Sequence, residues 1–80
     1  MKFIEPAFKP TYNTRVGVGI VNVSIVVSIR KSMFVHRDKL IYSIVFQFVG
    51  SNWGTWNYVD ETERDLTFDD LIDKVTLWYR

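Results

Sequence analysis

The chain has no cysteine, and its 80 residues include only two prolines, four glycines and one histidine. Without cysteine it can form neither disulfide bonds nor thiolate metal sites, which fits a reducing compartment and predicts a cytoplasmic location. A domain of this size buries only about 60% of the surface that its unfolded chain exposes. Because disulfides are excluded, oligomerisation is the remaining common device that stabilises a small domain, and we expect a homodimer.

Long apolar runs are also missing at the N-terminus, where Met1 is soon followed by charged residues and a proline. We therefore expect no signal peptide and no export. Residues 40–59 carry no charge, but they alternate with a period of two and include amides and glycines. This pattern favours a strand and a turn over a membrane span, so we expect no association with a membrane.

Apolar and aromatic residues, by contrast, are abundant: 48% of the chain is hydrophobic, and thirteen residues are aromatic. This composition is typical of a folded globular domain. The net charge is only +1, but residues 1–39 carry seven basic and two acidic residues, whereas residues 40–80 carry three basic and seven acidic residues. The two charged poles can pair within the fold or between two copies of it.

A long alternating stretch predicts a β-hairpin. Apolar side chains occupy the odd positions of its first half from residue 21 onward, interrupted only by Lys31, and the even positions of its second half. A loop of four residues brings both apolar rows onto one face of the sheet. This register places Val35 opposite Leu40 and Val27 opposite Phe48. The predicted strands cover residues 16–35 and 40–50.

Two prolines, Pro6 and Pro10, indicate that residues 1–13 form an extended arm rather than a helix. The arm carries several large apolar side chains, so we expect it to lie against the sheet. It either covers the core of its own chain or exchanges with a second copy. After the arm, a one-residue change of apolar phase beside Gly17 and Gly19 indicates a β-bulge, a bend, or a segment that is buried on both faces.

The C-terminal part of the sequence predicts a third strand and a helix. Turn-forming residues precede a predicted strand at residues 55–59, and an acidic linker follows at residues 60–65. Thr67 is a candidate N-cap for a helix over residues 67–79, whose apolar residues recur with helical spacing. We expect a single α+β domain over residues 1–80, in which this helix packs on one face of an antiparallel sheet of about three to four strands.

The residues that can support catalysis do not form a complete set. His36 is the only histidine, and it lies in the predicted hairpin loop, where a solvated side chain is usual. Seven acidic residues lie between Asp60 and Asp73, but no glycine is present there for a calcium-binding loop. Gly17 and Gly19 lack the third glycine of a dinucleotide-binding motif. We therefore expect a protein that is not an enzyme, with no metal, cofactor or small-molecule substrate.

Surplus apolar surface indicates a protein partner. One helix covers only one face of a small sheet, and the other predicted face is half apolar, so dimerisation through that face or through a sheet edge is expected. Three aromatic side chains are candidates for partner binding: Trp53, Trp56 and Tyr58. Trp53 lies at a chain reversal, where it either packs on the core or contacts a partner. We expect a non-catalytic protein-protein interaction module, such as a small phage-type or accessory protein that inhibits a larger protein by masking a surface.

A basic cluster supports an alternative function, nucleic-acid binding. The cluster comprises Arg30, Lys31, Arg37 and Lys39 in the distal part of the predicted hairpin. A two-stranded ribbon with such residues can enter a groove or follow phosphates. Asp38 at the tip and the nearly neutral chain favour instead a solvated tip, whose charges protect the edge of the sheet from aggregation.

Overall fold

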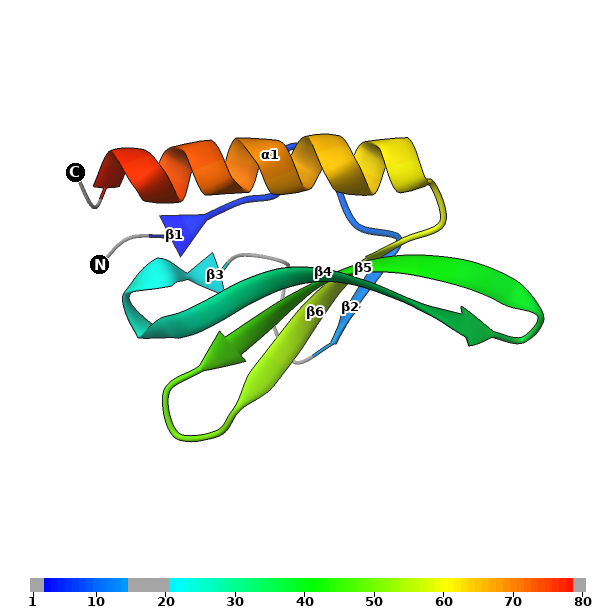
Figure 1. The fold of residues 1–80 in the computed structure, drawn as a ribbon, viewed down its shortest axis with the longest axis horizontal. Helices are drawn as coiled ribbons and strands as arrows, with labels where there is room; N and C mark the ends of the chain where they lie inside the picture. The colour runs from blue at the N-terminus through cyan, green and yellow to red at the C-terminus, as the bar shows by residue number, and fades with distance from the viewer. Residues whose placement is uncertain (1–2, 15–20, 79–80) are drawn as a thin grey trace.

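The chain folds into an antiparallel sheet with one long helix on one of its faces (Figure 1). The computed structural model describes residues 3–14 and 21–78. These residues form, in order, β1 (Phe3–Ile4), β2 (Tyr12–Thr14), β3 (Val21–Asn22), the 3₁₀ helix η1 (Val23–Ile25), β4 (Val26–His36), β5 (Lys39–Phe48), β6 (Trp53–Tyr58) and α1 (Glu61–Trp78). The predicted α+β fold, with a sheet built on a hairpin and a C-terminal helix, is confirmed.

The main sheet has four strands in the order β2-β6-β5-β4, all antiparallel, while β1 pairs separately with β3. The N-terminal arm supplies β1 and the edge strand β2. Ile4 of β1 is only 2% exposed and packs into the core of its own chain. The change of apolar phase expected beside Gly17 and Gly19 lies outside the described residues.

The register of the hairpin formed by β4 and β5 follows the predicted pairing over most of its length. Val35 lies opposite Leu40, as expected. The loop is shorter than predicted, because His36 and Lys39 still pair and only Arg37 and Asp38 form the turn. Both turn residues have positive φ angles, 51° for Arg37 and 63° for Asp38. A turn of this kind matches the right-handed twist of the two strands.

The first strand of the hairpin begins later than predicted. β4 starts at Val26, not at residue 16, because β3 and η1 occupy the residues before it. The Asn22 side chain accepts a hydrogen bond from the backbone N–H of Ser24 at 3.0 Å, and this local bond competes with strand pairing. A bulge then sets Val26, and not Val27, opposite Phe48. The bounds of β5 and β6 lie within two residues of those predicted.

The helix begins six residues earlier than the predicted Thr67 start, so the expected acidic linker at residues 60–65 is wrong. Asp60 is the N-cap: its Oδ1 accepts hydrogen bonds from the backbone N–H groups of Thr62 at 2.8 Å and Glu63 at 3.2 Å. The hydroxyl of Thr67 instead donates to the Glu63 carbonyl at 2.7 Å, which is the bond that a threonine inside a helix makes.

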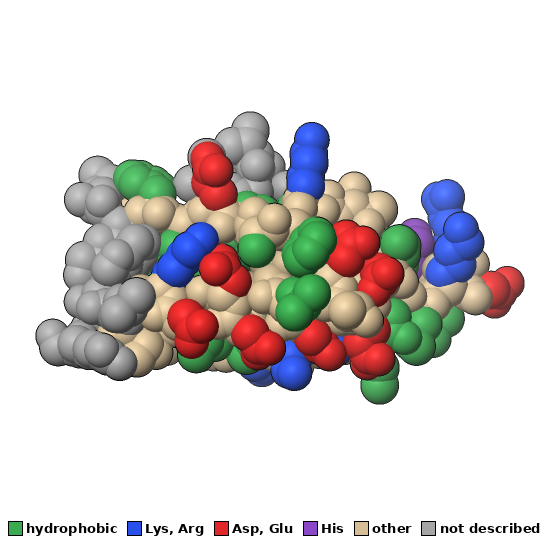
Figure 2. Space-filling view, turned by 90° about the horizontal axis from the view of Figure 1, so that it is seen from above, with side chains coloured by type: hydrophobic (Ala, Val, Ile, Leu, Met, Phe, Trp, Pro, Cys, Tyr) green, Lys and Arg blue, Asp and Glu red, His purple; other side chains and the backbone are tan. Residues whose placement is uncertain are grey.

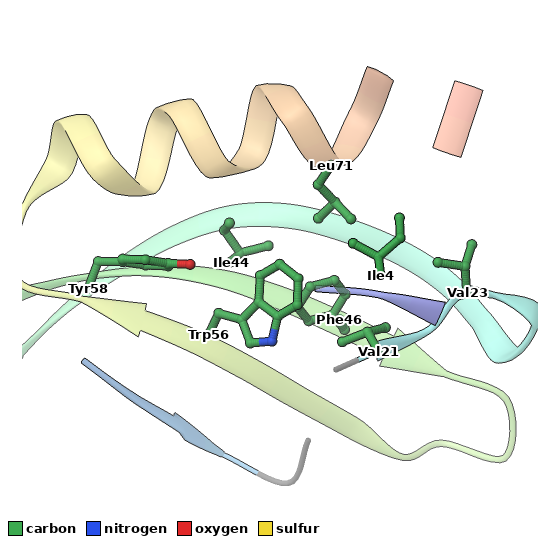
Figure 3. Packing of buried hydrophobic residues seen from close by; sticks show 8 residues of the cluster. All are labelled: Ile4, Val21, Val23, Ile44, Phe46, Trp56, Tyr58 and Leu71. Atoms are coloured by element: carbon green, nitrogen blue, oxygen red, sulfur yellow. The ribbon is translucent and has the colours of Figure 1, made fainter. Parts of the chain in front are cut away.

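The core lies between α1 and the side of the sheet that faces it (Figure 3). Its buried side chains are Ile4, Val21, Val23, Ile44, Phe46, Trp56, Tyr58 and Leu71. The even positions of β5 and β6 supply the large members of this group, so the helix packs on the predicted face. The rings of Phe46 and Trp56 meet edge to face, with centroids 4.7 Å apart and an angle of 70° between their planes.

One buried charge joins the helix to the hairpin. Arg64 is 6% exposed, and its Nη1 donates hydrogen bonds to the backbone carbonyls of Ser32 at 2.8 Å and Ser43 at 3.3 Å. Its Nε lies 2.6 Å from Asp65 Oδ1. The guanidinium carbon lies 5.4 Å from the centroid of the Tyr42 ring. Arg64 therefore ties the first turns of α1 to both strands of the hairpin.

Candidate protein-binding groove

The face of the sheet turned away from α1 has a hydrogen-bonded polar floor. The Ser43 hydroxyl donates a hydrogen bond to Asn57 Oδ1 at 2.8 Å, and Asn57 Nδ2 donates to Thr55 Oγ1 at 2.8 Å. These residues occupy odd positions of β5 and β6, whereas the even positions of both strands face the helix. Because the three side chains bond to one another, the floor is stable without a ligand.

Two adjoining hollows on this face form a groove, which we call the sheet groove. The first has a volume of about 350 Å³ and the second about 250 Å³. Val45, Trp53 and Thr55 line both hollows, so the two are continuous. The first hollow is completed by Arg30 and Gln47, and the second by Ser32, Phe34, Ser43 and Asn57. The groove therefore combines aromatic, aliphatic and polar side chains with one cation.

Cross-strand pairing places the lining residues side by side. Arg30 of β4 pairs with Val45 of β5, which in turn pairs with Thr55 of β6. Gln47 pairs with Trp53 in the next row on the same face. Arg30 thus puts a positive charge at the β4 side of the groove. Within the part of the chain that the structure describes, Arg30 forms no ion pair.

Trp53 is the aromatic side chain that lines both hollows, and it is 41% exposed. It follows a tight reversal in which Gly50 and Ser51 have positive φ angles of 82° and 65°. The backbone N–H of Phe48 donates to the Asn52 carbonyl across this reversal at 2.7 Å. The sequence left open whether Trp53 packs on the core or contacts a partner. The structure places it in the sheet groove, outside the buried core.

The other two aromatic candidates lie in the core, so the prediction that they contact a partner is wrong for this fold. Trp56 is 0% exposed and Tyr58 is 1% exposed. Both occupy the even, helix-facing positions of β6, because the even row of β5 beside them is also apolar. The Tyr58 hydroxyl donates to the Phe8 carbonyl at 2.8 Å, and burial raises the pKa of Tyr58 to about 12.

The four basic residues of the predicted nucleic-acid site do not form one cluster. Arg30 lines the sheet groove, whereas Lys31 is its neighbour on the opposite face. The Lys31 ammonium lies 3.7 Å from Asp65 and 5.3 Å from the centroid of the Phe68 ring. Arg37 and Lys39 remain together at the hairpin tip, residues 36–39, which projects past the first turn of α1 (Figure 1).

Two features of the surface were not found from the sequence. Phe34 lines the sheet groove although it was not identified as a candidate, and the only signal was its even position in β4, shared with Arg30. A third hollow of about 260 Å³, the α1–β4 cleft, lies between the C-terminal half of the helix and the first half of β4. It is lined by Val23, Val26, Val27, Ser28, Ile29, Ile72 and Val75. Its walls come from distant parts of the chain, so no local pattern indicates it.

Metal sites and membrane-spanning helices are two further features that bear on function. Across residues 3–14 and 21–78, no three histidine or acidic side chains are grouped as a metal site requires. In the same ranges, no helix combines the length and the apolar character needed to cross a membrane. No protein-family model, curated protein or solved structure matches this chain. Among the described residues, the sheet groove brings aromatic, aliphatic and cationic side chains together at the surface.

Proposed function

We propose that the protein is a non-catalytic interaction module that binds a protein partner through the sheet groove. The observation that supports this proposal is the exposure of Trp53 in both hollows, with Arg30 at one end and Phe34 at the other. Tryptophan and arginine are among the residues most enriched at the positions that dominate binding energy in protein interfaces. A surface that combines them in one groove is suited to a protein ligand.

The side chains that line the groove indicate which kind of ligand it can bind. Trp53, Phe34 and Val45 offer apolar contact. The Arg30 guanidinium, which forms no ion pair with another described residue, offers a fork of donors for a carboxylate. The polar floor makes its hydrogen bonds internally, so it places no further demand on the ligand. We propose that the ligand is an extended segment with a large apolar side chain and an acidic residue close to it. Covering such a segment would mask a surface of the larger protein and thereby inhibit it.

The proposal is tested by capturing partners on the tagged protein in cell lysate, with and without nuclease, and then measuring affinity for the protein retained. We expect Trp53→Ala to weaken binding by at least about tenfold, and Arg30→Glu to weaken it further because the proposed ligand carries an acidic residue. The matched control is Phe3→Ala, because Phe3 is an exposed aromatic residue on β1, away from the groove. A partner that binds Trp53→Ala as tightly as the wild type would contradict the proposal.

The hairpin tip supports a second candidate function, the binding of nucleic acid. Arg37 and Lys39 are exposed at the end of a projecting ribbon, and among the described residues neither forms an ion pair. Binding by these residues predicts an affinity that falls steeply with salt and is lost in Arg37→Gln/Lys39→Gln. Lys74→Gln, on the helix, serves as the control. Retention of the captured material despite nuclease, with no binding to nucleic acid, would exclude this candidate.

A further inference from the structure

The outer edge of β4 lacks a neighbouring strand among the strands that the structure describes. β4 has eleven residues and pairs with β5 on one side only, whereas the opposite edge of the sheet is the three-residue β2. A long exposed edge is a template for another strand, and soluble proteins normally cover or interrupt it. We propose that β4 pairs antiparallel with β4 of a second copy, about a two-fold axis at Ser32, so that the two sheets become continuous.

Charge disfavours Arg30 and Lys31 as the centre of this pairing, and the contacts across β4 favour Ser32. In a symmetric antiparallel pair, residues at equal distances on either side of the axis face each other, and both copies keep the same face of the sheet. An axis at Arg30 or Lys31 would set that cation against its own copy. An axis at Ser32 instead sets Arg30 opposite Phe34 of the second copy, a contact between a cation and an aromatic ring.

The same register joins two apolar surfaces on the helix side of the sheet. Beyond the helix, the hairpin exposes Met33 and Val35, which are 61% and 69% exposed. At the other end of β4, Ile29 lines the α1–β4 cleft. An axis at Ser32 sets Val35 of one copy opposite Ile29 of the other, beside the open cleft, and the two-fold axis repeats this contact. Each copy therefore covers apolar surface that its partner leaves exposed.

Electrostatics favour the same arrangement. Four acids are spaced four residues apart along α1: Glu61, Asp65, Asp69 and Asp73. The contact between Lys31 and Asp65 places this row on the side of the helix that flanks β4. Figure 2 shows acidic side chains along the helix, while at the projecting end of the molecule basic side chains and the histidine lie together with an acidic side chain. Pairing about Ser32 brings the hairpin tip of one copy beside the C-terminal half of α1 in the other. The basic side chains of the tip then lie near the acidic row of the helix, and the two-fold axis repeats this contact.

A single introduced cysteine tests the axis directly, because the chain has no cysteine of its own. Residues that face each other in antiparallel strands have Cα atoms about 4.5–5.5 Å apart, within the range that a disulfide spans. Ser32→Cys is therefore expected to give a disulfide-linked dimer under mild oxidation. Ser28→Cys, on the same strand and face, is the matched control, since its two copies would lie about 26 Å apart. Equal linkage of both variants, or linkage of neither, would overturn the proposal.

Sedimentation over a range of protein concentrations tests the apolar contact independently. We expect a dimer whose dissociation constant rises by at least about tenfold in Val35→Lys and also rises with salt. Val59→Lys, at a residue that is exposed to a similar extent but lies outside β4, should leave dimerisation unchanged. Because Trp53 lies on β6, Trp53→Ala should also leave the dimer intact. The experiment therefore distinguishes a wrong proposal about partner binding in the sheet groove from a wrong proposal about dimerisation through β4. A wild-type chain that stays monomeric at every concentration would overturn the proposal.

Discussion

Replacing Arg64 by leucine should remove the polar link between the helix and the hairpin. The side chain of Arg64 is 8% exposed, and its guanidinium donates to two backbone carbonyls that belong to adjacent strands. Leucine keeps much of the aliphatic volume and favours a helix, so propensity contributes little to the change. The acids beside Arg64, Glu61 and Asp65, are 58% and 42% exposed at their side chains, so water can solvate them after the substitution.

The expected loss comes mainly from the carbonyls of Ser32 and Ser43. Hydrogen bonds that involve a charged group contribute about 1.5–3 kcal/mol each, and relief of the buried charge offsets part of the sum. Since Ser43 is 1% exposed, water cannot replace the lost donor there. We therefore expect Arg64→Leu to lower the free energy of unfolding by about 3 kcal/mol. For a domain of this size, such a loss lowers Tm by about 12–24 °C.

Urea denaturation followed by circular dichroism measures this change, with Lys74→Leu as the control. Lys74 is also a helix cation paired with an acid, Asp70, at 2.9 Å, but its side chain is 46% exposed. An exposed pair of this kind contributes about 0.5 kcal/mol or less, so the control should unfold almost as the wild type does. If Arg64→Leu were as stable as Lys74→Leu, the buried hydrogen bonds would contribute nothing, and the account of the helix-to-hairpin link would be refuted.

Two further predictions concern the helix start and the core tyrosine. Asp60→Ala should remove the N-cap and lower the free energy of unfolding by about 1 kcal/mol, measured by thermal denaturation, whereas Asp69→Ala on the exposed helix surface should have little effect. The pKa of Tyr58 is raised from 10.0 to about 12 in the folded state, so its contribution to stability is complete below pH 10 and is lost as the pH rises towards 12. Tyr58→Phe should abolish this part of the pH dependence, and an unchanged profile would contradict the burial of the phenol.

The pairing of β4 with β5 could be predicted because it follows from local pattern. Strand periodicity and a short turn determine which side chains share a face, and a shift of one residue would expose every apolar side chain. The start of β4 could not be predicted in the same way. The bond between Asn22 and Ser24 is a local alternative to strand pairing, and the apolar pattern continues through it without interruption.

The start of the helix, like the start of β4, could not be predicted from local pattern. Its apolar residues from Phe68 onward are visible as a stripe, but its first two turns carry few apolar residues. There the buried position belongs to Arg64, whose burial depends on carbonyls of strands 21 and 32 residues away in the chain. The predicted helix rests on its apolar stripe, which begins only after these turns. For this reason the predicted start is too late, and the first turns are predicted to be a linker.

The sequence by itself determined the class of fold, the hairpin register from Ser28 to the tip and the face on which the helix packs, because these follow from the periods of strands and helices. Only the tertiary structure decided which aromatic side chains are buried. Trp53 and Trp56 lie three residues apart on one strand and therefore on opposite faces, and burial depends on which face the helix covers. The sheet groove, the α1–β4 cleft and the position of β4 at the edge of the described sheet likewise arise from strand order and packing between distant segments, which no local pattern specifies.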